Sequence, residues 1–334
     1  MSLITANLSA TWQQILANVI TDPAELCRLL ELDNKWIEPA RLAAAKFPLR
    51  VPHGFVARMQ KGNPYDPLLL QVLPLAAELH LHQDYSVDPL QEAATNPLPG
   101  LLHKYQGRVL LNIISACGIH CRYCFRRFFP YAENNPGSQG WEKVLDYIQQ
   151  DSSIEEVIFS GADPLAANDR VLASLSQKIA AITHVKRLRI HTRMPIVIPA
   201  RITAEFISWF TATRLQSILV VHCNHAQEID ASVMAAMQLL KTHGVTVLNQ
   251  SVLLRDINDS VASLKALSEV LFSCGVLPYY LHLLDKVQGA AHFDVSEVEA
   301  RELMRKLMLQ LPGYLVPKLV REIAGEGSKT SITV

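Results

Sequence analysis

Residues 108–124 read RVLLNIISACGIHCRYC, and this stretch holds the two signals on which the fold assignment depends. Residues 109–115 form a short apolar run, which predicts a buried strand. Cys117, Cys121 and Cys124 follow that strand directly. In folds built from parallel strands, reactive side chains gather where the strands end. The stretch therefore predicts a chemical site at the carboxyl end of a parallel strand.

Similar apolar runs recur along the chain, with room for a helix between each pair. They predict five more strands, at 156–160, 187–191, 218–222, 245–252 and 279–284. Helical patterns lie at 141–150, 169–182, 203–213, 229–242, 259–274 and 295–310. This alternation is typical of parallel strands joined by right-handed helical crossovers. Six such units predict an α/β fold, either a partial (β/α)6 barrel or a large doubly wound sheet.

Polar residues follow every predicted strand, not only the first. Loops between strands and helices are often polar, so any one of these positions has an ordinary explanation. All six together favour a single functional rim at one end of the sheet. The polar segments after the second to sixth strands are 160–163, 191–193, 222–225, 249–251 and Asp285.

The flanking segments differ from this regular middle part. Residues 1–95 are helical and loop-rich, and Asp22-Pro23 is typical of a helix N-cap followed by a first-turn proline. Proline- and glycine-containing breaks near 95–107 indicate the junction to the main domain. We therefore expect an N-terminal helical segment over 1–95, a barrel over 96–312 and a short C-terminal segment over 313–334.

Composition limits the class of protein. The 334 residues include 31 Lys+Arg and 31 Asp+Glu, and 49% are hydrophobic, which argues against a disordered chain. With no basic excess, a nucleic-acid-coating protein is disfavoured. No run of 18 apolar residues predicts a membrane span. Because MSLITANLSATW lacks the features of a signal peptide, we expect a cytoplasmic protein.

The six cysteines are unevenly spaced, and disulfides are not expected in a reducing compartment. Cys27, Cys223 and Cys274 are scattered and are expected to be buried apolar residues. The other three, spaced C-x3-C-x2-C, can bind three irons of a [4Fe–4S] cluster and leave the fourth iron free. Zinc would need a fourth ligand, for which His120 is the nearby choice. Incidental cysteines are the remaining alternative.

The C-x3-C-x2-C spacing is the motif of the radical SAM enzymes, and the chain resembles one branch of them, the lysine 2,3-aminomutase family. The similarity runs from about residue 99 to 330, and it is nearest to the branch that makes (R)-β-lysine for bacterial elongation factor P. It implies a partial (β/α)6 radical SAM barrel, a [4Fe–4S] cluster, S-adenosylmethionine and pyridoxal phosphate (PLP). The stretches that carry it are HKYQGRVLLNIISACGIHCRYCFRRFFPYAE, RLRIHTRMPIVIPARIT, LNQSVLLRDIND, PYYLHLLDKVQGAAHF and YLVPKLVREIAGEGSK.

The resemblance assigns roles to residues that the local pattern leaves open. Lys329 lies in a glycine-containing loop and by itself would be a solvated tail lysine, but it matches the family's Schiff-base lysine for PLP. Arg126, otherwise one charge in an arginine run, matches the arginine that binds the substrate carboxylate. Asp285 and Glu322 match two acids that bind the substrate's distant ammonium group. Glu322 stands where Asp is typical of the family.

Further positions match the cofactor sites of the family. Lys104, which replaces a more usual arginine, Arg108 and Gln250 match positions near the PLP phosphate. The region around S-adenosylmethionine is matched by Gly161, Ala162, Asp163, Thr192, Arg193 and His222. Ala162 stands where the family usually has glycine, and His222 is equally well read as a structural strand-end histidine. His292 is expected to be structural.

The function implied by the resemblance is that of an isomerase, an L-lysine 2,3-aminomutase acting on free lysine. It further implies a reductant such as flavodoxin or ferredoxin, and an indirect link to elongation factor P and its lysyl ligase. One rival is an aminomutase of another cationic amino acid, because two acids favour a cationic substrate over glutamate. The others are a non-catalytic iron–sulfur protein and an inactive relative. No membrane or nucleic-acid partner is expected.

Overall fold

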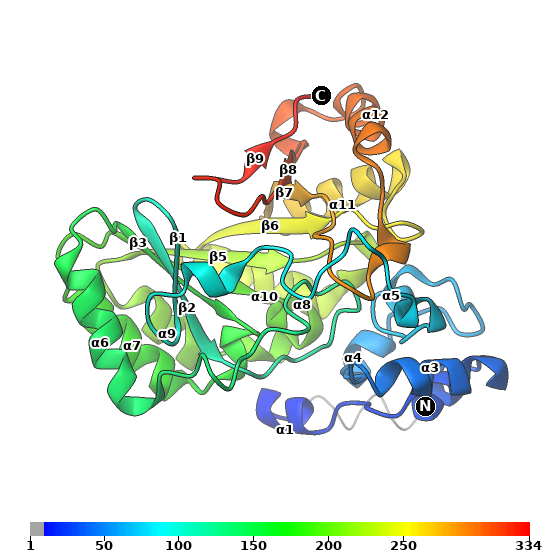
Figure 1. Ribbon diagram of the computed structural model, residues 1–334, viewed down its shortest axis with the longest axis horizontal. Helices are drawn as coiled ribbons and strands as arrows, with labels where there is room; N and C mark the ends of the chain where they lie inside the picture. The colour runs from blue at the N-terminus through cyan, green and yellow to red at the C-terminus, as the bar shows by residue number, and fades with distance from the viewer. Residues whose placement is uncertain (1–9) are drawn as a thin grey trace.

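A single nine-stranded sheet organises the protein in the computed structural model, which describes residues 10–334 (Figure 1). Neighbours in the sheet are also neighbours along the chain, in the order β1 to β9. Strands β2 to β8 are parallel, while β1 and β9 are antiparallel edges. Within the described residues the two edges do not pair, so the sheet is an open, partial barrel. The strands are β1 Leu101–Tyr105, β2 Arg108–Ile114, β3 Glu156–Gly161, β4 Arg187–Thr192, β5 Gln216–His222, β6 Thr246–Val252, β7 Leu277–His282, β8 Lys318–Arg321 and β9 Thr330–Ser331.

The six predicted strands are confirmed as β2 to β7, and the α/β class with a partial barrel is confirmed with them. Three strands were not predicted. Strand β1 lies in the segment interpreted as a junction, and β8 and β9 lie in the C-terminal segment. Strand β8 adds a seventh parallel strand beside β7. All three are short, so none has the long apolar run or alternation that identifies a strand from sequence.

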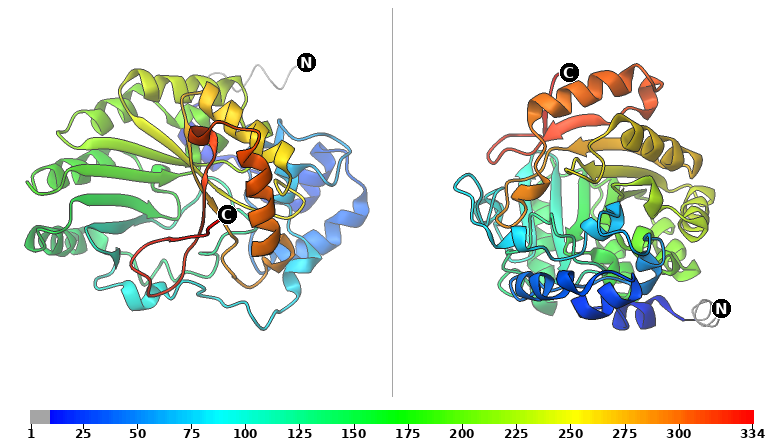
Figure 2. Two further views of the ribbon diagram at one scale, coloured as in Figure 1. Left: turned by 90° about the horizontal axis from the view of Figure 1, so that it is seen from above. Right: turned by 90° about the vertical axis from the view of Figure 1, so that its right-hand side faces the viewer.

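The predicted crossover helices are all present, and side chains cap most of them. Asn168, Thr203, Asp230, Ser260 and Ser296 each accept a hydrogen bond from the first turn of the helix that follows. These helices lie outside the curved sheet (Figure 2). They are α6 Gly137–Gln150, α7 Asp169–Ala180, α9 Ala204–Thr211, α10 Ala231–Thr242, α11 Val261–Ser273 and α12 Glu297–Met308.

The N-terminal segment packs as part of the same body, at the opposite side from the C-terminal strands (Figure 1). Asp22 caps α2 with Pro23 at its first position, as predicted. Buried Trp12, Leu26 and Phe55 belong to the same apolar cluster as the strands of the sheet. The short helices are α1 Trp12–Ala17, α2 Pro23–Leu29, α3 Ile37–Ala44, α4 His53–Val56 and α5 Pro67–Leu70. Residues 1–9, at the start of the predicted N-terminal segment, lie outside the described residues.

Burial separates the core from the rim. Most apolar side chains of β2 to β6 are buried, while Leu110, Ile218 and Leu248 are half-buried and line the cavity. The scattered cysteines Cys27, Cys223 and Cys274 are buried and free, as predicted. No helix among the described residues is long and apolar enough to cross a membrane. The packed core holds the strand ends in place, and the three cysteines follow the end of β2.

Candidate active site

One cavity of about 680 Å³ opens at the carboxyl ends of the strands. All sixteen predicted site residues line it, so the structure brings them together in one place. These residues are Lys104, Arg108, Cys117, Cys121, Cys124, Arg126, Gly161, Ala162, Asp163, Thr192, Arg193, His222, Gln250, Asp285, Glu322 and Lys329. Residues that are far apart in the sequence, from Lys104 to Lys329, are therefore brought to one site.

The cysteine loop is held in place by the N-terminal segment. Arg50 donates from Nε to the carbonyl oxygen of Cys117 at 2.8 Å, and the amide of His120 donates back to the carbonyl of Arg50 at 2.9 Å. The amide of Arg122 donates to the carbonyl of Gln71 at 2.9 Å. These bonds satisfy backbone groups that a strand or helix would otherwise pair. The loop therefore has a defined shape without regular secondary structure.

A buried carboxylate fixes two of the arginines in the same loop. Arg122 donates to both oxygens of Glu78, from Nε at 2.8 Å and from Nη2 at 2.5 Å. Arg127 donates from Nη2 to Glu78 at 2.8 Å. All three side chains are almost fully buried. Such two-pronged, charge-assisted contacts fix geometry as well as charge, so Glu78 orients the loop that carries the cysteines.

The cysteine side chains fit an iron–sulfur cluster better than a single ion. No three His, Cys, Asp or Glu side chains in the described part of the chain could hold one metal ion. Burial raises the pKa of Cys117 well above its usual value and that of Cys124 to about 12, and nearby thiolates raise both further. A cationic cluster core would offset this repulsion. Three cysteines sharing one cavity wall thus suit three corners of a [4Fe–4S] cluster. His120, the zinc alternative, lies with Nδ1 2.9 Å from the carbonyl oxygen of Pro48.

The turn after β3 is tight, and it explains the glycine there. Gly161 has a φ of +106°, and a Cβ at this position would lie 3.1 Å from the Cα of Asn112. Ala162 is not among the non-glycine residues with positive φ in the described chain, so its methyl group causes no backbone strain. The departure from the family's second glycine is therefore compatible with the turn.

Asp163 links the ends of β3 and β4. Its carboxylate accepts from Thr192 Oγ1 at 2.6 Å and from the backbone amides of Arg193 at 2.7 Å and Met194 at 3.1 Å. Burial raises the pKa of Asp163 to about 6, while these donors lower it. The side chain is therefore engaged in holding the two strand ends together.

Five charged residues that line the cavity form a chain of alternating sign: Arg126, Glu92, Lys104, Glu322 and Lys329. Arg126 donates to both oxygens of Glu92 at 2.7 Å, and Lys104 Nζ lies 2.8 Å from the same carboxylate. Lys104 also donates to Glu322 at 2.9 Å, and Lys329 donates to the other oxygen of Glu322 at 2.7 Å. Against the effect of burial, Lys329 and Lys104 hold the pKa of Glu322 well below its usual value. The positive and negative side chains neutralise each other inside the cavity.

Asp285 differs from Glu322 because, among the described residues, no hydrogen bond or ion pair joins its carboxylate to a cation, whereas Glu322 contacts Lys104 and Lys329. Burial raises the pKa of Asp285 to about 7, and the negative charge of Glu322 raises it further. The two acids face the same part of the cavity, where a second carboxylate charge is unfavourable. A cation entering between them would remove that penalty. The pair is therefore suited to binding an ammonium group.

Three histidines line the cavity beside these charges, of which His282 is buried and His191 and His222 are half-buried. Burial lowers the pKa of His222 to about 3, and those of His191 and His282 well below their usual value. All three are therefore neutral at pH 7. His222 Nε2 lies 3.0 Å from the Gln250 amide nitrogen. The Nε2 atoms of His191 and His282 are buried without a hydrogen-bond partner among the described residues.

The part of the cavity lined by Lys104, Glu322 and Lys329 fits PLP. Lys329 supplies a primary amine, and Lys104, Arg108 and Gln250 supply charge and donors suited to a phosphate. Lys329 Nζ lies 5.9 Å from the ring centre of Tyr280, which stacks on Tyr279 with centroids 3.8 Å apart. An aromatic wall and a cationic end together suit a planar phosphorylated cofactor.

Several residues of the site were not predicted. Glu92 lies in a short 3-10 helix within the loop-rich segment, and Glu78 and Gln71 lie in the same segment. Glu228 follows β5 in another 3-10 helix. No local pattern distinguishes these residues from solvent-exposed polar groups. Only Glu228 had a signal in the sequence, because it follows β5 and polar residues after a strand are expected at the rim.

The open parallel sheet, with three cysteines after its first parallel strand, defines the class: an α/β iron–sulfur enzyme of the radical SAM type. Residues 106–194 match a family model described as "4Fe-4S single cluster domain". Among solved structures, a radical SAM methyltransferase from Sphaerobacter thermophilus is 15% identical with a TM-score of 0.47, over 66% of this chain and 68% of that one.

Curated relatives narrow the class. An L-lysine 2,3-aminomutase of Escherichia coli (strain K12) is 53% identical over 96% of this chain and 94% of its own length. One from Haemophilus influenzae is 51% identical over the same shares. The chain belongs to the lysine 2,3-aminomutase family. The resemblance that the sequence motifs indicated is thereby confirmed.

Proposed function

We propose that this protein is an L-lysine 2,3-aminomutase that converts L-lysine to (R)-β-lysine. The observation that carries the proposal is the cavity itself, which Lys329 and the three cysteines line together although they are far apart in the sequence. An iron–sulfur protein without substrate chemistry has no use for a lysine in that position. The match to aminomutases over nearly their full length supports the same reaction.

When bound, the cluster and S-adenosylmethionine supply a carbon-centred radical, and PLP supplies the unsaturated linkage through which the amino group migrates. The chain's own residues bind and orient. In our proposal, Lys329 holds PLP, and Lys104, Arg108 and Gln250 bind its phosphate. The S-adenosylmethionine side of the cavity is formed by Gly161, Ala162, Asp163, Thr192 and His222. Arg193 contacts the sulfur of Cys121. Enclosure of the cavity excludes water from the radical.

The substrate is placed by charges at its two ends. Arg126 binds the carboxylate of lysine, and Asp285 with Glu322 binds its distant ammonium group. Lysine therefore brings an anion toward an arginine and a cation toward two acids. If bound PLP engaged Lys329 and Lys104, the substrate ammonium would take their place as the partner of Glu322. This exchange keeps the buried carboxylates neutralised.

Two acids also select the kind of substrate. A substrate with a carboxylate side chain would place a third negative charge beside Asp285 and Glu322, which disfavours glutamate. Ornithine and arginine satisfy the same charge pattern, and they are the alternative substrates. The side chain of Glu322 is one methylene longer than that of the usual Asp, which would change the substrate length that fits.

The cellular setting is part of the proposal. We assign the protein to the cytoplasm, where six free cysteines remain reduced. A flavodoxin or ferredoxin would supply the electron for the cluster. The β-lysine would serve a separate lysyl ligase that modifies elongation factor P.

The test is an anaerobic assay of reconstituted protein with L-lysine, PLP, S-adenosylmethionine and dithionite, followed by chromatographic separation of lysine and β-lysine. K329A should form no β-lysine and should lose the absorbance of bound PLP. K318A is the matched control, because Lys318 is an exposed lysine near the same end of the chain. Cleavage of S-adenosylmethionine without β-lysine would move the substrate to ornithine or arginine. No cleavage with an intact cluster would refute the proposed activity.

A further inference from the structure

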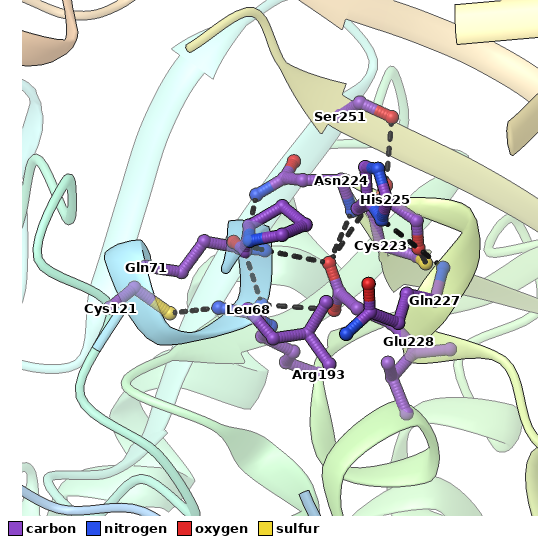
Figure 3. A network of polar contacts seen from close by, with 12 residues as sticks. Leu68, Gln71, Cys121, Arg193, Cys223, Asn224, His225, Gln227, Glu228 and Ser251 are labelled. Atoms are coloured by element: carbon purple, nitrogen blue, oxygen red, sulfur yellow. Dashed lines mark hydrogen bonds and ion pairs between the residues drawn. The ribbon is translucent and has the colours of Figure 1, made fainter. Parts of the chain in front are cut away.

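Arg193, at the end of β4, reaches behind the cysteine loop and is almost fully buried. Its Nη1 donates to Cys121 Sγ at 2.7 Å (Figure 3). The same nitrogen donates to the Tyr123 hydroxyl at 2.8 Å. Its Nη2 donates to Gln71 at 2.6 Å and to Glu228 at 2.9 Å. The family resemblance matched Arg193 to the region around S-adenosylmethionine. In the structure both of its terminal nitrogens donate to protein groups, one of them a cysteine sulfur.

Glu228 is held as firmly as the arginine that it contacts. Its side chain is fully buried, and Oε1 accepts from the backbone amides of Asn224 at 2.9 Å and His225 at 3.1 Å. The Gln71 amide donates to the same oxygen at 3.1 Å. Figure 3 shows these side chains converging on the guanidinium from the N-terminal segment and from the loop after β5. Arg193 therefore cannot turn away from Cys121 without breaking several buried hydrogen bonds.

The charge of this arginine has a direct consequence at the sulfur. An arginine side chain stays protonated in proteins, and hydrogen bonds to cysteine sulfurs raise the reduction potential of a cluster. Reduction adds one electron to the cluster, from 2+ to 1+, without making or breaking a bond. A fixed cation at Cys121 stabilises the more negative, reduced state more than the oxidised one. The carboxylate of Glu228 lies on the far side of the guanidinium and offsets part of this effect.

We propose that Arg193 sets the reduction potential of the cluster through Cys121, with Glu228 and Gln71 as its positioning residues. The inference rests on the iron–sulfur cluster of the proposed function but not on its substrate. The titration below is therefore run without lysine, PLP or S-adenosylmethionine. Failure of the aminomutase activity would leave this result standing, and the reverse also holds.

The test measures the midpoint potential of the reconstituted cluster by dithionite titration, with the reduced cluster followed by electron paramagnetic resonance. R193Q should lower the equilibrium constant for one-electron reduction at least tenfold, which corresponds to about 59 mV. E228Q should shift the potential in the opposite direction, because it removes the offsetting negative charge. R193K, which keeps the charge but not the planar fork, should fall between R193Q and the unmodified protein.

Opposite shifts separate an electrostatic effect from structural damage, since damage to the loop would move both variants the same way. R201Q is the matched control. Arg201 is a fully buried arginine after the same strand, paired with Asp169 at 2.8 Å and bonded to no cysteine sulfur. It should lose stability without changing the potential. Unchanged potential in R193Q, or equal shifts in R193Q and E228Q, overturns the proposal. If R193Q binds no iron, the directions in which R193K and E228Q shift the midpoint potential decide whether the proposal holds.

Discussion

Glu92 provides the sharpest test of how the charges in the cavity are balanced. One of its oxygens contacts both Arg126 Nη2 at 2.7 Å and Lys104 Nζ at 2.8 Å. The two cations are therefore no more than about 5.5 Å apart. The Glu92 side chain is 2% exposed, so this bridge is shielded from water. E92Q keeps the size of the side chain and removes the charge that holds the two cations together.

The expected loss follows from the distance. Two unit charges at about 5 Å repel each other by roughly 3 kcal/mol at an effective dielectric constant near 20. Removing one partner of a buried ion pair costs about 3–5 kcal/mol in measured cases. We therefore expect E92Q to lower the free energy of unfolding at pH 7 by about 3 kcal/mol, as measured by urea denaturation of the cofactor-free protein.

A matched control and an anion test complete this experiment. Glu155 also bridges two cations, Lys186 at 2.5 Å and Arg187 at 3.2 Å, but it lies at the surface. E155Q should show no comparable loss, because exposed ion pairs contribute little. Inorganic phosphate should stabilise E92Q more than the unmodified protein, since it supplies the missing negative charge. Equal stability of E92Q and E155Q, or no difference in the response to phosphate, would refute the charge-balance argument.

Three further predictions follow from the site. Because the folded-state pKa of Asp285 is raised to about 7, the folded protein binds that proton more tightly than the unfolded chain does. The free energy of unfolding should therefore fall as pH rises from about 4 to 7. Urea denaturation of D285N across this range should lack this pH-dependent loss of stability. G161A should lower the free energy of unfolding by about 1–3 kcal/mol because of its positive φ, whereas G54A, in helix α4 with open space around it, should not; equal melting temperatures would contradict this. E78Q should reduce the iron bound per chain after reconstitution, because Glu78 holds two arginines of the cysteine loop. E38Q is the control and should bind iron normally, because Glu38 pairs with Arg41 at the exposed surface.

Local patterns in the sequence were sufficient for the class of fold and for the centre of the site. The six strands β2 to β7 were predicted because each contains a short run rich in apolar, strand-forming residues, and these runs alternate with helical patterns. The three cysteines were found because their spacing places three thiols on one loop. Grouping polar residues at one rim required only the rule that parallel strands end on the same side.

The partners of those residues were decided by tertiary structure. Arg126 is paired with Glu92 and Arg193 with Glu228, and Glu78 and Gln71 reach the cysteine loop from the N-terminal segment. Such pairs depend on how distant segments pack, and one carboxylate in a loop has no pattern that distinguishes it from a solvated one.

The short strands β1, β8 and β9 were missed for a related reason, because their pairing depends on a neighbour rather than on their own composition. The sequence by itself therefore determined the α/β class and the three-cysteine motif, since these follow from local composition and spacing, and its resemblance to a known family indicated the aminomutases and the candidate site residues. Only the folded chain decided which charges neutralise one another inside the cavity, because burial and distance set that choice.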